Sequence, residues 1–206
     1  MEHANYMVDF APAIPEMVMA VGAMALLMFG VFRKESPTAL VSYGTVVLFI
    51  ITAFLVMGQG DTTATTFAGQ FTIDPFTRFI KLLILLGAAA AVIMSLTFIR
   101  REGMDRFEFP VLIALATLGM MMMVSAGSFL ALYMGLELQS LAIYVIAAFN
   151  RDNGKSSEAG LKYFVLGALS SGLLLYGCSL VYGFTGSVEF TAVAKAIGED
   201  NTNIGL

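Results

Sequence analysis

The sequence predicts an all-α membrane protein, a polytopic bundle of transmembrane helices. Hydrophobic residues make up 58% of the 206 residues and charged residues 13%, against roughly 25% charged residues in an ordinary soluble domain. Mean hydropathy is +0.84. The apolar residues gather in six long runs, and none of these alternates with a period of two, so the pattern favours helices over a membrane β-barrel.

The six runs approach the length of about 20 apolar residues that an α-helix needs to cross a bilayer core. The expected spans are approximately 15–32, 38–57, 76–99, 109–124, 128–149 and 158–185, within a single membrane domain over 1–206. No cleavable signal peptide is expected, because Glu2, Asp9 and Glu16 stand where a basic segment would precede the first run.

Local signals support the helix ends in chain order. Pro15 suits the first turn of the first helix, and a polar loop rich in Thr and Gly precedes the third. The fourth is short and opens with Pro110. The connection 125–128 is so short that the fourth and fifth helices must be antiparallel neighbours, with Ser128 as the N-cap of the fifth.

Small residues in the sixth run would let another helix approach closely, so the last three helices are expected to form one compact cluster. These small residues are Gly160, Gly167 and Ser171, and Ala168 with Gly172. After them, the tail from 186 to 206 carries Phe190, Val193 and Ile197 at helical spacing, which indicates an amphipathic segment outside the membrane.

Basic residues predict the orientation, because short cytoplasmic loops are enriched in Lys and Arg. If six spans alternate, eight of the eleven basic residues fall on one side: Arg33, Lys34, Arg100, Arg101, Arg106, Arg151, Lys155 and Lys162. The other side receives Arg78, Lys81 and Lys195. The loops after the first, third and fifth spans are therefore expected in the cytoplasm, with both chain ends outside.

The strongest functional candidate is Glu137, which is the single Asp, Glu, Lys, Arg or His residue in the run 128–149. In a helix it lies about 14 Å from the nearer end, too deep for its short side chain to reach water. A carboxyl group at that depth is costly and marks a functional site by default. Tyr133, Ser140 and Tyr144 share its helix face; the alternative for this polar stripe is interhelical hydrogen bonding.

A membrane carboxyl group coupled to a movable base makes a proton relay. Lys81 and Lys162 are the candidate bases, although both could instead be lysines that extend to the membrane surface. Neither lies at the depth of Glu137. The sequence holds no nucleotide, redox-cofactor or metal motif, a single cysteine (Cys178), no basic run that indicates nucleic acid, and no role for His3.

Three stretches carry a resemblance to a known family: MGLELQSLAIYVIAAF at 134–149, EAGLKYFVLGALSSGLLLYGCSLVYGFTG at 158–186 and FTIDPFTRFIKLLILL at 71–86. They resemble subunit N of bacterial respiratory complex I, the NADH:quinone oxidoreductase, whose family includes mitochondrial complex I subunit 2. The resemblance covers nearly the whole chain.

The resemblance implies an antiporter-like subunit built from two inverted repeats, located in the bacterial inner membrane. It implies that Glu137 is the membrane glutamate that pairs with a lysine of a seventh helix, and no residue here matches that lysine. Subunits of the family are more than twice this length, so the sequence is expected to be the N-terminal part of one.

The implied partners are neighbouring antiporter-like subunits, small hydrophobic subunits and the lipid bilayer. NADH, FMN, iron–sulfur clusters and quinone are implied for the complex and no cofactor for this chain, so the enzyme label comes from the assembly. Two alternatives stay open: a subunit of a multi-subunit cation/proton antiporter, and a purely structural subunit of the membrane arm.

Overall fold

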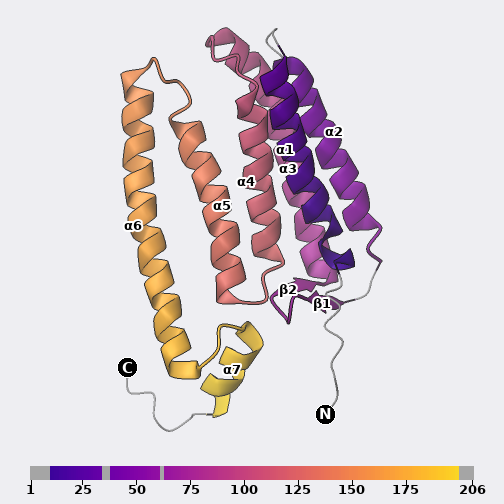
Figure 1. Ribbon diagram of the computed structural model, residues 1–206, viewed down its shortest axis with the longest axis vertical. Coiled ribbons are helices and arrows are strands. Elements are labelled where there is room, and N and C mark those ends of the chain that lie inside the picture. The colour runs from indigo at the N-terminus through magenta and orange to yellow at the C-terminus, as the bar shows by residue number, and fades with distance from the viewer. Residues whose placement is uncertain (1–9, 34–37, 61–62, 200–206) are drawn as a thin grey trace.

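The computed structural model describes residues 10–33, 38–60 and 63–199; the expectations for His3 and Lys34 lie outside these ranges. Six long helices run side by side, with a small hairpin and a short helix at one end (Figure 1). In chain order the elements are the 3₁₀ turn η1 (Ala11–Ala13), α1 (Ile14–Phe32), α2 (Thr38–Met57), β1 (Ala64–Thr66), β2 (Phe71–Ile73), α3 (Pro75–Arg101), α4 (Glu108–Val124), α5 (Phe129–Ala147), α6 (Gly154–Thr185) and α7 (Phe190–Glu199).

The membrane helix bundle is the fold class that the sequence predicts. Each of the six expected ranges coincides with one of α1 to α6, and five of these are long and apolar enough to cross a membrane. The helix α4 has 17 residues, which is about 25 Å at roughly 1.5 Å per residue. The largest boundary difference is at α6, which begins earlier than expected because the Asn153 side chain accepts a hydrogen bond from the backbone N–H of Lys155 at 3.0 Å.

The core lies among α1, α2, α3 and α4, where Met19, Phe49, Val92 and Met121 are almost fully buried. Three buried hydroxyls of α2 donate to backbone carbonyls four residues earlier in the same helix, at 2.7–2.9 Å. Their polar groups are thus satisfied without a partner helix, which lets this side of α2 pack in an apolar interior.

The helices α4 and α5 approach each other most closely at two glycines. A Cβ on Gly119 would lie 2.5 Å from the backbone N of Gln139, and one on Gly135 would lie 2.8 Å from the backbone N of Met123. These two helices are antiparallel neighbours as expected, and Ser128 caps α5 by accepting from the N–H of Ala131 at 3.2 Å.

The expected compact cluster of α4, α5 and α6 is only partly correct. The helix α4 packs on α5 and also on α1, α2 and α3, whereas α6 packs mainly on α5. Gly160 fits against Ala148, the C-cap residue of α5, and Gly167 fits against Tyr144 within α5. A Cβ added at Gly172 would have no atom within 4 Å. The small residues of α6 are therefore used in its first half, and Figure 1 shows α6 at the outer side of the bundle.

One end of the bundle is closed by connecting segments that hydrogen-bond to one another. The antiparallel strands β1 and β2 form a hairpin that sequence analysis missed. The N–H of Thr72 donates to the carbonyl of Ser125 at 2.8 Å, and that of Phe129 donates to the carbonyl of Val188 at 3.0 Å. The loops before α3, before α5 and after α6 thus meet at the same end, as an alternating path of six helices requires.

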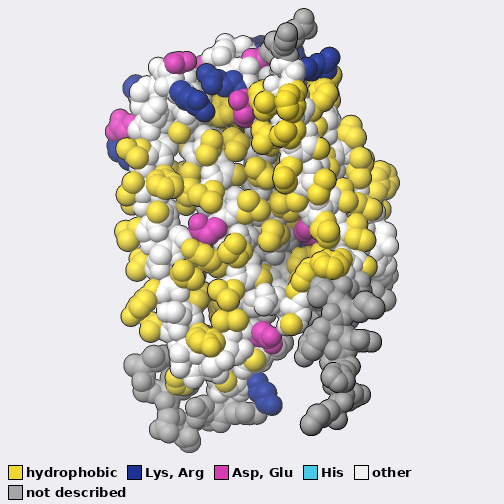
Figure 2. Space-filling model, viewed as in Figure 1, with side chains coloured by type: hydrophobic (Ala, Val, Ile, Leu, Met, Phe, Trp, Pro, Cys, Tyr) yellow, Lys and Arg dark blue, Asp and Glu magenta, His cyan; other side chains and the backbone are white. Residues whose placement is uncertain are grey.

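The expected amphipathic segment of the tail is α7, whose Val193 is buried. Lys and Arg side chains gather at the opposite end of the bundle, above a broad band of hydrophobic side chains (Figure 2). The C-terminal ends of α1, α3 and α5 lie at this basic end.

Candidate functional site

Glu137 lies near the middle of α5 and faces α6. Its carboxylate accepts a hydrogen bond from the hydroxyl of Ser171 on α6. The hydroxyl of Tyr133, one turn earlier on α5, lies 2.9 Å from the same Ser171 oxygen. Because the single proton of Ser171 is directed to Glu137, Tyr133 is the donor in that second contact. The three groups form a short chain of hydrogen bonds between two helices.

Ser140 and Tyr144, the other members of the polar stripe, border a cavity of about 560 Å³ between α5 and α6. Gln139, Ser170 and Ser171 also line it, so the group that binds Glu137 lies at its wall. A cavity with several polar side chains and this volume has room for water that could exchange protons with Glu137.

Tyr144 serves mainly as a packing residue. Its hydroxyl lies over Gly167, at a position where an added Cβ would clash with it. Its ring makes edge contacts with the rings of Tyr163 and Phe164, at centroid distances of 4.9 and 5.7 Å. The structure thus brings Glu137, Ser140 and Tyr144 to one interface, with Ser171 as the residue that the sequence analysis had treated only as a small packing position.

The two candidate lysines pair with other acids. Lys81 Nζ lies 2.6 Å from Glu16 Oε1, with side chains 0% and 7% exposed. It also lies 4.9 Å from the ring centroid of Phe71, in the hairpin. The interpretation of Lys81 as a lysine extending to the membrane surface differs from this arrangement, because its side chain is fully buried and paired with Glu16.

Lys162 lies on the surface of α6, and its Nζ is 2.5 Å from Glu158 Oε1 one turn earlier. The two side chains are 70% and 62% exposed. Among the residues that the structure describes, no basic side chain makes an ion pair with Glu137.

The start of α3, which carries Lys81, is fixed by Asp74. Its carboxylate accepts a hydrogen bond from the backbone N–H of Thr77 at 2.6 Å. Hydrogen bonds from the Thr77 side chain and then its backbone hold the pKa of Asp74 below its usual range. Asp74 is thus an N-cap in its charged form.

The Glu16–Lys81 pair has a weak signal in the sequence. Glu16 is the one acidic residue of the first run. It stands near the start of a helix, where the positive end of the helix dipole favours a negative charge, so its presence can be explained without an ionic partner. Only the folded structure shows that its carboxylate meets a lysine 65 positions later.

Comparison with known proteins finds relatives over nearly the whole chain. The family described as NADH:quinone oxidoreductase/Mrp antiporter, TM matches residues 126–206. NADH-quinone oxidoreductase subunit N of Parvibaculum lavamentivorans is 64% identical over 96% of this chain and 41% of its own length. The chain is therefore similar to subunit N over nearly its whole length. Subunit N of Paramagnetospirillum magneticum is 54% identical over 96% of this chain and 42% of its own, so the chain spans about two fifths of the relatives' length.

Solved structures agree with this family in fold. A chain of respiratory complex I from Thermus thermophilus, solved with bound aureothin, matches with a TM-score of 0.72 at 30% identity, over 89% of this chain and 41% of that one. A chain of an archaeal membrane-bound sulfane sulfur reductase matches with a TM-score of 0.76 at 20% identity, over 91% and 40% of the two chains, which shows the fold alone. The antiporter-like bundle is therefore shared by this chain and both complexes.

Proposed function

We propose that this chain is part of a membrane-arm subunit of a proton-translocating NADH:quinone oxidoreductase. The observation that supports this most strongly is the 64% identity with a subunit N over 96% of the chain. In this proposal the chain lies in the bacterial inner membrane, beside antiporter-like and small hydrophobic subunits. NADH, FMN, iron–sulfur clusters and quinone belong to the complex, and the redox chemistry belongs to its other subunits.

Glu137 is the proton-binding residue in this proposal. It lies in a membrane helix and accepts a hydrogen bond from Ser171. Ser171 also lines the cavity between α5 and α6. A carboxyl group in such a place can take up and release a proton without leaving the bundle. Lys81 and Lys162 would act only indirectly, because each is held by another glutamate.

The proposed orientation places the basic end of the bundle in the cytoplasm and the hairpin end outside, with the N-terminus outside. It rests on the gathering of Lys and Arg at one end (Figure 2) and on the excess of such residues in cytoplasmic loops. Cysteine labelling from either side of sealed vesicles tests it: a cysteine replacing Ser187 should react from outside, and one replacing Asp152 from the cytoplasmic side.

The test of function is Glu137→Gln in the full-length subunit within the assembled complex. We expect the ratio of protons translocated to electrons transferred to fall. Glu158→Gln is the matched control, because Glu158 is an exposed glutamate of the neighbouring helix, and it should leave the ratio unchanged. An unchanged ratio at full turnover in Glu137→Gln would refute the role. Should that variant fail to assemble, Glu137→Met, which also removes the carboxyl group, provides the same comparison.

A cation/proton antiporter subunit is the second candidate, because the matching family description names Mrp antiporters as well. Purification of the native complex distinguishes the two. Flavin and iron–sulfur subunits that co-purify with the chain would favour the oxidoreductase, and their absence from an active, intact complex would favour the antiporter.

A further inference from the structure

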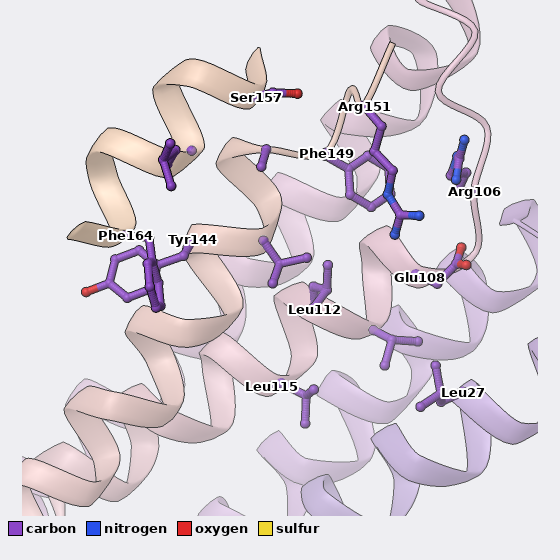
Figure 3. Close-up of a pocket in the computed structure, with 15 residues that line it drawn as sticks. Leu27, Arg106, Glu108, Leu112, Leu115, Tyr144, Phe149, Arg151, Ser157 and Phe164 are labelled. Carbon is purple, nitrogen blue, oxygen red and sulfur yellow. The ribbon is translucent and has the colours of Figure 1, made fainter. Parts of the chain in front are cut away.

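A second cavity lies at the basic end of the bundle, where α1, α4, α5 and α6 meet (Figure 3). Its volume is about 670 Å³, within the range of roughly 300–1,000 Å³ of small-molecule sites. Each helix contributes apolar side chains to its wall, among them Leu27, Leu112, Val145 and Leu161. The cavity exists because α6 leans on α5 without packing closely on α4.

The polar residues of this cavity gather at one end. Arg106 and Arg151 line it from the loops after α3 and α5, together with Glu108 at the start of α4. Figure 3 shows these three near the loops, with Leu115 and Leu27 farther along the helices. The cavity therefore has two guanidinium groups and one carboxylate near its loop end, and an apolar interior.

Neither guanidinium forms an ion pair with any residue that the structure describes, and both arginines are exposed. They lie at the end of the bundle where basic residues gather (Figure 2). Basic side chains at the ends of membrane helices favour the level of the lipid headgroups. An arginine presents a planar fork of donors that matches the oxygens of a phosphate. Two such forks beside one carboxylate leave a site that favours a negative ligand.

We propose that this cavity binds an anionic phospholipid, with the phosphate between Arg106 and Arg151 and one acyl chain along the apolar wall. The ligand must carry a negative charge at the end that meets the two arginines near the loops. The rest of it must be apolar, because the remaining wall of the cavity is apolar. Basic pockets between membrane helices on the cytoplasmic side are known to suit such headgroups. A neutral amphiphile would leave both guanidinium groups without an anionic partner.

The test uses the full-length subunit in its assembled complex, in vesicles that contain a phosphatidylglycerol probe with a photoactivatable acyl chain. We expect crosslinks to peptides that contain Leu112 and Leu161. The corresponding phosphatidylcholine probe should label them about 25-fold less, because each arginine near an anionic headgroup favours it about fivefold. Labelling reports lipid binding whether or not the subunit translocates protons.

Two variants and a control sharpen the result. Arg106→Gln with Arg151→Gln should remove most of the preference for phosphatidylglycerol, and Leu112→Trp should lower labelling by filling the cavity with the charges intact. Arg100→Gln with Arg101→Gln, basic residues at the end of α3 that do not line the cavity, should change neither. Equal labelling by both probes, an equal loss in the control, or displacement by inorganic phosphate alone would overturn the proposal.

Discussion

Replacing Lys81 with methionine should strongly destabilise the bundle. Methionine retains most of the volume of the lysine stem, so the substitution removes the charge and leaves little empty space. The carboxylate of Glu16 would then be left in a site where its side chain is only 7% exposed, with its ionic partner at 2.6 Å gone. The contact of the ammonium group with the ring of Phe71 would also be lost.

The magnitude follows from the burial of both partners. Breaking a buried ion pair by removing one partner costs about 3–5 kcal/mol, because the remaining charge is uncompensated. Replacing both partners by uncharged residues of similar size costs far less. Glu16→Gln with Lys81→Met should therefore recover most of the stability that Lys81→Met alone loses, an interaction energy of about 2–3 kcal/mol.

The measurement is reversible unfolding of the full-length subunit in mixed detergent micelles, for the two single variants and the double variant. Lys162→Met is the matched control: its ion pair with Glu158 is as short, but both side chains are well over half exposed, so a change of at most about 0.5 kcal/mol is expected. A loss below about 1 kcal/mol for Lys81→Met, with no recovery in the double variant, would refute the reasoning.

Three further results are expected. Gly135→Ala should cost about 1–3 kcal/mol in the same unfolding measurement, because its Cβ would meet backbone atoms of α4, whereas Gly172→Ala, with no atom nearby, should be neutral or stabilising. Asp74 has a depressed pKa, so the stability that its N-cap contributes is fully present above the unfolded-state pKa of about 3.9. This stability is lost as the pH falls through the lower folded-state pKa. Asp74→Asn should abolish this acid dependence of unfolding. Ser171→Ala should slow proton translocation by up to about tenfold, since a hydrogen bond to a charged group contributes about 1.5 kcal/mol, and more than Tyr133→Phe, which keeps the bond to Glu137. Equal proton translocation rates in these last two variants would contradict that order.

The helices could be predicted from the sequence because each apolar run is long and ends at a local signal. Ser128 illustrates this: its hydroxyl and the brevity of the loop before it predict both a cap and an antiparallel neighbour, and the structure has both. The hairpin could not be predicted, since its strands have three residues each and depend on bonds to the distant Ser125.

The site was predictable only in part. Depth along α5 singles out Glu137, and helical spacing gives its neighbours Tyr133 and Ser140. The partner across the interface, Ser171, depends on the packing of α6 on α5, and small residues along α6 give several equivalent faces for such packing. Lys81 is the converse case: its position near a helix end indicates a surface, and only the fold around it shows an enclosed ion pair.

Glu137 is proposed to gain and lose a proton during turnover of the complex. Infrared difference spectroscopy of the assembled complex, recorded as it is driven by NADH, measures this through the stretching band of a protonated carboxyl group. We expect a carboxyl band that disappears in Glu137→Gln and stays in Glu158→Gln. Identical difference spectra for the wild type and Glu137→Gln would contradict it.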